Sequence, residues 1–213
     1  MIDPSNIDLQ EFLALWYGPP NRLPSPLPRE CDWLPEPLRE WHGIISCWTP
    51  SPQSVKRMTP PAEIKESEGK AVFMKDPSGD WLWAFDVANK STIFDAELHG
   101  EWSETSEHFP EFLIHNALNE TVYGASAWRE CTNVHSELLP EILSPMTAVS
   151  LGEWRWPTPG GRIFMSDELL AEVSPAMRSS KGAESWEVRV ASSDSRHLSY
   201  LDSLESVKWM GPR

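Results

Sequence analysis

The sequence lacks most features of a secreted or membrane-bound protein. Its three cysteines, Cys31, Cys47 and Cys131, are widely separated and form no CxxC pair. Their number and spacing exclude a disulfide framework and are typical of free thiols in a reducing compartment. No uncharged hydrophobic run approaches the roughly 20 residues of a membrane span, and the first ten residues, which include Asp3 and Asp8, have no secretory-signal pattern. We therefore expect a cytoplasmic protein that does not enter a membrane.

Basic side chains are also scarce. Lys and Arg total 18 against 32 Asp and Glu, so the formal net charge is −14. Binding to nucleic acid or to an anionic membrane needs clustered positive charge, and the composition argues against both. A basic protein is the partner that such a charge would attract, although acidity can also serve solubility alone.

Signatures of catalysis and of metal binding are missing. The six histidines show no HExxH or HxxxH pairing, no serine lies in a GxSxG motif, and Gly160-Gly161 lacks the companions of a phosphate-binding loop. We therefore expect a protein that is not an enzyme and has no catalytic residue, metal or cofactor. Glu63-Ile64-Lys65 matches the E-x-K half of a metal-dependent nuclease site, which keeps a nuclease as a minor alternative.

Proline is abundant and unevenly placed. Twelve of the 20 prolines fall within the first 61 residues, where they leave room for short helices only. Hydrophobic spacing predicts one helix from about Leu9 to Trp16, with Asn6 as its N-cap, and a second from about Glu36 to His42.

The rest of the chain predicts mainly β-structure. Residues 71–74 and 81–85 flank a turn-rich segment and predict a hairpin, with a further strand at 91–94. A helix is predicted at 109–123. The last third predicts a hairpin of residues 153–156 with 162–165, a strand near Val173, another at 186–191, and a short helix and edge strand within 197–209. The fold class is therefore α+β, with a mostly antiparallel sheet flanked by a few short helices.

Two tryptophan pairs have strand spacing. Trp81 and Trp83 share one strand parity, as do Trp154 and Trp156, so each pair is expected on one face of a sheet. Exposed pairs would form a platform for a sugar, and inward-facing pairs would form a core. The apolar Leu82 between the first pair favours the core. A glycan- or small-ligand-binding module remains the alternative function.

The acidic residues are concentrated in one stretch. No Lys or Arg lies between Lys90 and Arg129, but seven Asp and Glu do. The net charge is −11 through Glu130 and −3 after it. A loop-borne acidic patch beside Trp102 is typical of a protein-binding surface, whereas a solvated face near a helix N-terminus is the alternative interpretation.

Three blocks in a fixed order resemble a known family. They are FLALWYGPP at 12–20, LPEPLREWH at 34–42 and VFMKDPSGDWLWA at 72–84. Together they resemble the SUKH superfamily, in particular its bacterial immunity-protein branch, which is related to fungal cell-wall-synthesis regulators. The resemblance covers roughly residues 9–128. The segment Lys75-Asp76-Pro77-Ser78 departs from it, since many relatives carry Glu-Asn-Gln there.

The resemblance implies a SUKH-like α+β fold and a non-catalytic immunity protein. Such a protein binds and neutralises a cognate polymorphic toxin, and a basic toxin domain such as a nuclease fits an acidic surface. We expect a SUKH-like domain at 1–130 and a β-rich extension at 131–213, packed in the same globular unit. The oligomeric state is left open. The candidate partner-binding residues are Asp95, Glu97, Glu101, Trp102, Glu104 and Glu107.

Overall fold

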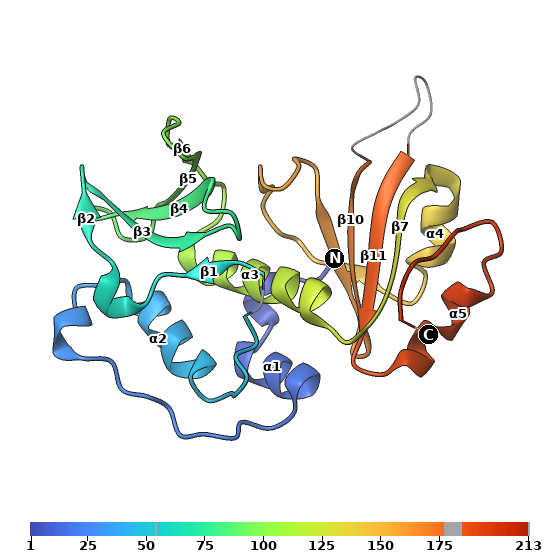
Figure 1. Cartoon of the computed structure of the whole chain (residues 1–213), viewed down its shortest axis with the longest axis horizontal. Helices are drawn as coiled ribbons and strands as arrows, with labels where there is room; N and C mark the ends of the chain where they lie inside the picture. The colour runs from blue at the N-terminus through green and yellow to red at the C-terminus, as the bar shows by residue number, and fades with distance from the viewer. Residues whose placement is uncertain (54, 177–184, 213) are drawn as a thin grey trace. The chain divides into compact units, whose positions relative to one another are not determined.

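The structure is a computed structural model that describes residues 1–53, 55–176 and 185–212. The chain forms two compact units, an N-terminal unit (Ile7–Glu120) and a C-terminal unit (Thr121–Arg213 together with Met1–Asn6). Each unit contains one antiparallel sheet and helices (Figure 1), which confirms the α+β class. The expected boundary at residue 130 falls instead inside a strand, β7 (Ala127–His135).

The N-terminal unit has a six-stranded sheet in the order β1-β3-β4-β5-β6, with β2 paired to β3. Its strands are β1 (Arg57–Met58), β2 (Glu66–Ser67), β3 (Lys70–Lys75), β4 (Trp81–Asp86), β5 (Ile93–Glu97) and β6 (Ser103–Glu104). The predicted hairpin is confirmed as β3 and β4, which pair antiparallel. The strand predicted at 91–94 begins two residues later, at Ile93.

A β-bulge in β3 determines which of its side chains face the core. The register with β4 shifts between Val72 and Met74, so one strand residue has no direct partner there. As a result Phe73 and Met74, although consecutive, are both completely buried. The ring of Phe73 lies 5.1 Å from that of Phe109 and 5.6 Å from that of Phe112. The inner face of the sheet therefore packs on α3 (Phe109–Gly124), the helix predicted at 109–123.

Two short helices complete this unit, and both were predicted. In α1 (Leu9–Tyr17) the N-cap is Asp8, not Asn6, because the Asp8 carboxylate accepts a hydrogen bond from the Glu11 N–H at 2.9 Å. The helix α2 (Glu36–Ile45) runs three residues past the predicted end. It continues through Gly43 because its buried face extends to Ile45. Single 3₁₀ turns occur at η1 (Pro4–Asn6), which belongs to the C-terminal unit, and at η2 (Arg29–Cys31) and η3 (Pro61–Glu63).

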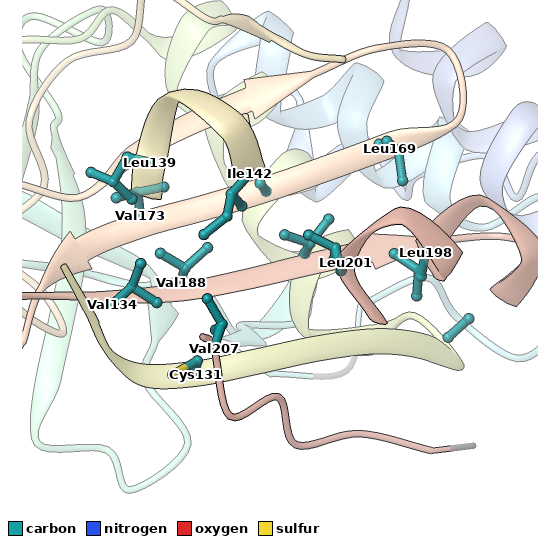
Figure 2. Close-up of a cluster of buried hydrophobic side chains, with 13 residues drawn as sticks. Cys131, Val134, Leu139, Ile142, Leu169, Val173, Val188, Leu198, Leu201 and Val207 are labelled. Atoms are coloured by element: carbon teal, nitrogen blue, oxygen red, sulfur yellow. The ribbon is translucent and has the colours of Figure 1, made fainter. Parts of the chain in front are cut away.

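The C-terminal unit has a five-stranded sheet in the order β7-β11-β10-β9-β8. Its remaining elements are η4 (Ser136–Leu138), α4 (Leu139–Ile142), β8 (Thr147–Ala148), β9 (Arg162–Met165), β10 (Leu169–Pro175), β11 (Ser185–Ser192), η5 (Ser195–Leu198) and α5 (Ser199–Asp202). Figure 2 shows its core, in which Val173 and Val188 of the sheet meet Ile142 of α4 and Leu201 of α5.

The predictions for this unit are confirmed in part. The short helix predicted within 197–209 is present as α5, but no edge strand follows it among the described residues. Strands occur near Val173 and at 186–191, as β10 and β11. Residues 153–156, however, form no strand, and β9 pairs with β8 and β10 instead. The prolines at 157 and 159 follow the run directly and cannot donate to a ladder, so the place beside β9 goes to Thr147–Ala148. Every helix in the part of the chain that the structure describes is too short or too polar to cross a membrane.

Candidate protein-interaction surface

The connection from β5 to β6 forms a short turn that we call the acidic hairpin (residues 97–104). Figure 1 shows β6 at one edge of the sheet. The Leu98 N–H donates to the Asp80 carbonyl at 2.6 Å, and the Gly100 N–H donates to the Glu97 carbonyl at 2.8 Å. His99 has a φ of 67°, the left-handed conformation that this tight turn requires. These contacts fix the backbone from which the acidic side chains project.

Three of the predicted contact residues are exposed carboxylates of this hairpin, namely Glu97, Glu101 and Glu104. Trp102 is half-buried, and Leu98 is one of the few large apolar side chains of the chain that stay exposed, at 45%. No Lys or Arg occurs within residues 97–104. The hairpin therefore presents acidic groups around an apolar and aromatic centre.

The three carboxylates do not share one flat face. Glu97 pairs with Trp81 across the β4–β5 ladder, whereas Glu104 pairs with Phe94 across the β5–β6 ladder. Side chains alternate along β5, so Glu97 and Phe94 point to opposite sides of the sheet. Glu104 therefore lies on the opposite side from Glu97, and the acidic surface wraps around the end of the sheet.

Two of the six predicted contact residues are not at the surface, and that part of the prediction is wrong. Asp95 is only 3% exposed because it lies on the inner side of the sheet, paired with the fully buried Trp83. Glu107 is 4% exposed, and its Oε1 lies 2.9 Å from Nδ1 of His115 on α3. Both carboxylates help to hold the unit together instead of facing a partner.

A third acid of the same stretch, Glu120, is also buried. Its carboxylate accepts hydrogen bonds from the N–H groups of Val55 and Lys56, both at 2.7 Å. The Lys56 ammonium lies 3.3 Å from Glu120 Oε1 and donates to Asn119 Oδ1 at 2.5 Å. The counter-charge of Glu120 thus comes from a residue 64 positions away in the sequence. A count of all seven acids in this stretch therefore overstates the negative charge at its surface.

The strand pairing adds groups that the sequence pattern did not reveal. Asp80 is exposed and its carbonyl holds the hairpin, so its carboxylate extends the acidic surface at the start of β4. Lys70 lies with its Nζ 4.0 Å from the centre of the Phe94 ring, next to the strand that carries Glu104. Only the register of the strands brings these residues near the hairpin, since 17 or more positions separate them from it.

The other candidate sites have little support. Glu63 and Lys65 are exposed on either side of the buried Ile64, and no group of three or more His, Cys, Asp or Glu in the described ranges could hold a metal ion. Trp83 and Trp154 are buried, so neither tryptophan pair presents two exposed indoles. The core interpretation therefore holds for one member of each pair.

A second surface feature is a groove at the end of α2. It has a volume of about 770 Å³ and is lined by residues 22–26, His42, Ile45, Ser46, Trp48, Thr49 and Ser51. Burial lowers the pKa of His42 to about 4, so its imidazole is neutral at pH 7. The Nε2 atom of His42 is buried and has no hydrogen-bond partner among the described residues. A neutral imidazole whose Nε2 atom is buried is poorly placed to exchange protons with a ligand.

Comparisons with known proteins give no family assignment. No protein-family model matches the chain. No curated protein matches it, and no solved structure does.

Proposed function

We propose that this chain is a non-catalytic, SUKH-like immunity protein that binds a basic toxin domain, such as a nuclease, through the acidic hairpin. One observation carries the proposal. Within eight residues the hairpin exposes the carboxylates of Glu97, Glu101 and Glu104 with no cation among them, beside the exposed Leu98 and the half-buried Trp102.

Such a surface combines the two contributions that a tight protein complex needs. Its negative charge speeds the encounter with a basic partner and opposes an acidic one. Leu98 and Trp102 supply the apolar and aromatic contact area that is desolvated at the centre of an interface. An enzyme that acts on a polyanion has a basic active site, so a partner that covers this site with carboxylates also excludes the substrate.

The resemblance over roughly residues 9–128 supports the same function. The matching residues Trp41, Trp83 and Ala84 are completely or almost completely buried, and Gly18 ends α1 with a φ of 79°. These positions build the N-terminal unit, which leaves the hairpin after β5 free to vary with the partner.

The test uses the protein encoded by the neighbouring reading frame. We expect this chain to protect cells that express that protein and to bind it 1:1, with an affinity that falls as salt is raised. The double variant Glu97→Lys/Glu101→Lys is expected to weaken binding about 100-fold or more, since it reverses two charges at the interface. The matched control is Glu63→Lys/Glu66→Lys, which makes the same charge change at two other exposed positions of this unit.

The outcomes separate the function from its location. Protection that survives the hairpin variant, with unchanged affinity, would show that another surface makes the contact. A neighbouring protein that is neither bound nor neutralised would contradict the immunity function itself.

A further inference from the structure

The connection between α1 and α2 contains a segment in which every second residue is proline. We call residues 23–28, Leu-Pro-Ser-Pro-Leu-Pro, the proline segment, and Figure 1 shows it within the long blue loop between the two helices. Each residue is either a proline, whose ring fixes φ, or precedes a proline, which disfavours the helical region. The backbone forms no turn or bend there, and Pro28 has a φ of −60° and a ψ of 151°. The segment is therefore an extended polyproline II strand.

Hydrogen bonds tie this strand to the residues that follow α2. The Arg22 N–H, just before the segment, donates to the Cys47 carbonyl at 3.1 Å. Within the segment, the Ser25 N–H donates to Oγ of Ser46 at 2.8 Å. An anchored strand loses less conformational freedom on binding than a flexible loop does, so the entropic cost of forming a complex is lower.

The proline segment is nevertheless open to a partner. All of its residues are exposed except Leu27, which is half-buried, and Leu23 is 89% exposed. The carbonyl groups of residues 23–27 accept no hydrogen bond from any described residue. The groove of about 770 Å³ at the end of α2 borders Leu23, Pro24 and Pro26. Proline rings, an apolar side chain and carbonyl groups that can accept hydrogen bonds are thus presented together.

The charge around the proline segment differs from that of the acidic hairpin. No Asp or Glu occurs within residues 12–29 or 41–62, which include the segment and the residues that hold it. None of the described residues that line the groove is acidic, and Arg22 is one of them. Arg29 follows the segment, but the neighbouring Glu30 offsets its charge. The net contribution of this part of the sequence is therefore basic, at its Arg22 end.

We infer that the proline segment binds, as a polyproline II strand, in a groove of aromatic side chains on another protein. Aromatic rings pack against proline rings and apolar side chains, and indole N–H or phenol O–H groups donate to the carbonyl groups of the strand. Acidic side chains at one end of the groove pair with Arg22. The inference does not depend on the proposed function, because it concerns a different surface and a different partner.

The geometry of the strand indicates which side chains make the contact. With three residues per turn, Leu23 and Pro26 lie on one edge of the strand, and Pro24 and Leu27 lie on another. Both residues of the first edge are exposed, whereas Leu27 of the second is half-buried. The edge of Leu23 and Pro26 is therefore the one that enters the aromatic groove.

An NMR titration of the full-length, isotope-labelled chain tests the inference. The probes are three purified domains with aromatic grooves for proline-rich strands, namely an SH3, a WW and an EVH1 domain. At least one is expected to shift the amide signals of Leu23, Ser25 and Leu27, with a Kd of roughly 10–100 µM because the contact is small. The same domain with its groove tryptophan replaced by alanine is expected to bind about tenfold or more weakly.

Variants of the chain locate the contact. The double variant Leu23→Ala/Pro26→Ala is expected to raise the Kd about tenfold or more, because it removes the exposed edge. Pro60→Ala is its matched control, an exposed proline of the same unit with a φ of −52°, and should leave the Kd unchanged. Arg22→Glu is expected to raise the Kd about threefold or more, whereas the exposed Arg57→Glu should not.

Two results would overturn the inference. One is the absence of shifts at the proline segment with all three domains at about 1 mM, a concentration at which even weak binding is detected. The other is binding that Leu23→Ala/Pro26→Ala leaves unchanged, since the domain would then contact another surface. Circular dichroism of each variant shows whether the fold is kept, so lost folding is not mistaken for lost binding.

Discussion

Removing the buried ion pair between Lys56 and Glu120 gives the most direct test of what stabilises the N-terminal unit. The two side chains are 0% and 2% exposed, and Nζ lies 3.3 Å from Oε1. Replacing Lys56 with methionine keeps most of the aliphatic stem but removes the cation. The Glu120 carboxylate then stays buried and still accepts hydrogen bonds from the backbone N–H groups of residues 55 and 56.

The expected cost of Lys56→Met follows from this geometry. Breaking a buried pair by removing one partner typically costs about 3–5 kcal/mol. The two backbone hydrogen bonds to Glu120 still stabilise its charge, which places the loss near the lower limit, about 3 kcal/mol. For a unit of this size that corresponds to a fall in the unfolding temperature of about 12 °C.

The assay is a double-mutant cycle in urea. The free energy of unfolding is measured by circular dichroism for Lys56→Met, Glu120→Gln and the double variant, with the exposed Lys65→Met as control. Hydrogen exchange of peptides from α3 shows whether the loss falls in this unit. We expect the double variant to lose at least about 1 kcal/mol less than the two single losses combined. A loss below about 1 kcal/mol for Lys56→Met, or an additive cycle, would refute the reasoning.

Two further predictions concern titratable groups of the same unit. His42 has a pKa lowered to about 4 by burial, so between pH 6.5 and 4 the unfolded chain binds more protons and the folded state loses stability as the pH falls. His42→Gln is expected to flatten the difference between urea midpoints at pH 7 and pH 4.5, and an NMR titration of His42 near 6.5 would contradict this. Burial raises the pKa of Asp76, but hydrogen bonds from Ser78, Trp81 and Gly79 outweigh it and hold that pKa below its usual value. Asp76→Ala is therefore expected to cost about 2–3 kcal/mol and Asp76→Asn less, measured by urea unfolding at pH 7, and equal costs would show that the charge is unimportant.

Local signals predicted the elements that are continuous in sequence. The hairpin of β3 and β4 was predictable because two β-prone runs flank a segment rich in turn residues, and α3 because its entry and exit carry Pro110 and Gly124. The strand pairing of the C-terminal unit was not predictable from local signals. Residues 153–156 have strand-like composition, yet β9 pairs with Thr147–Ala148, and no local signal ranks one neighbouring segment above the other.

The candidate surface was predicted only in part, because the burial of its acidic residues depends on residues elsewhere in the sequence. The count of acids between Lys90 and Arg129 located the hairpin, but it could not separate exposed carboxylates from buried ones. Glu107 is buried next to His115, and Glu120 is buried in an ion pair with Lys56. Lys56 lies far from Glu120 in the sequence. Burial of a charge depends on such partners, so composition alone could not exclude these two residues.

The bulge in β3 shows how one irregular residue decides which side chains of a strand face the core. With regular alternation along β3, Lys75 would share the inner side with Phe73, and Met74 would point outward with Val72. The bulge between Val72 and Met74 shifts the alternation by one residue, so Phe73 and Met74 both enter the core and Lys75 faces outward. The same shift completes the hydrophobic core and places Lys75 on the side of the sheet that also carries Phe94 and Glu104. A sequence pattern read with a strict period of two therefore assigns Lys75 to the wrong side of the sheet.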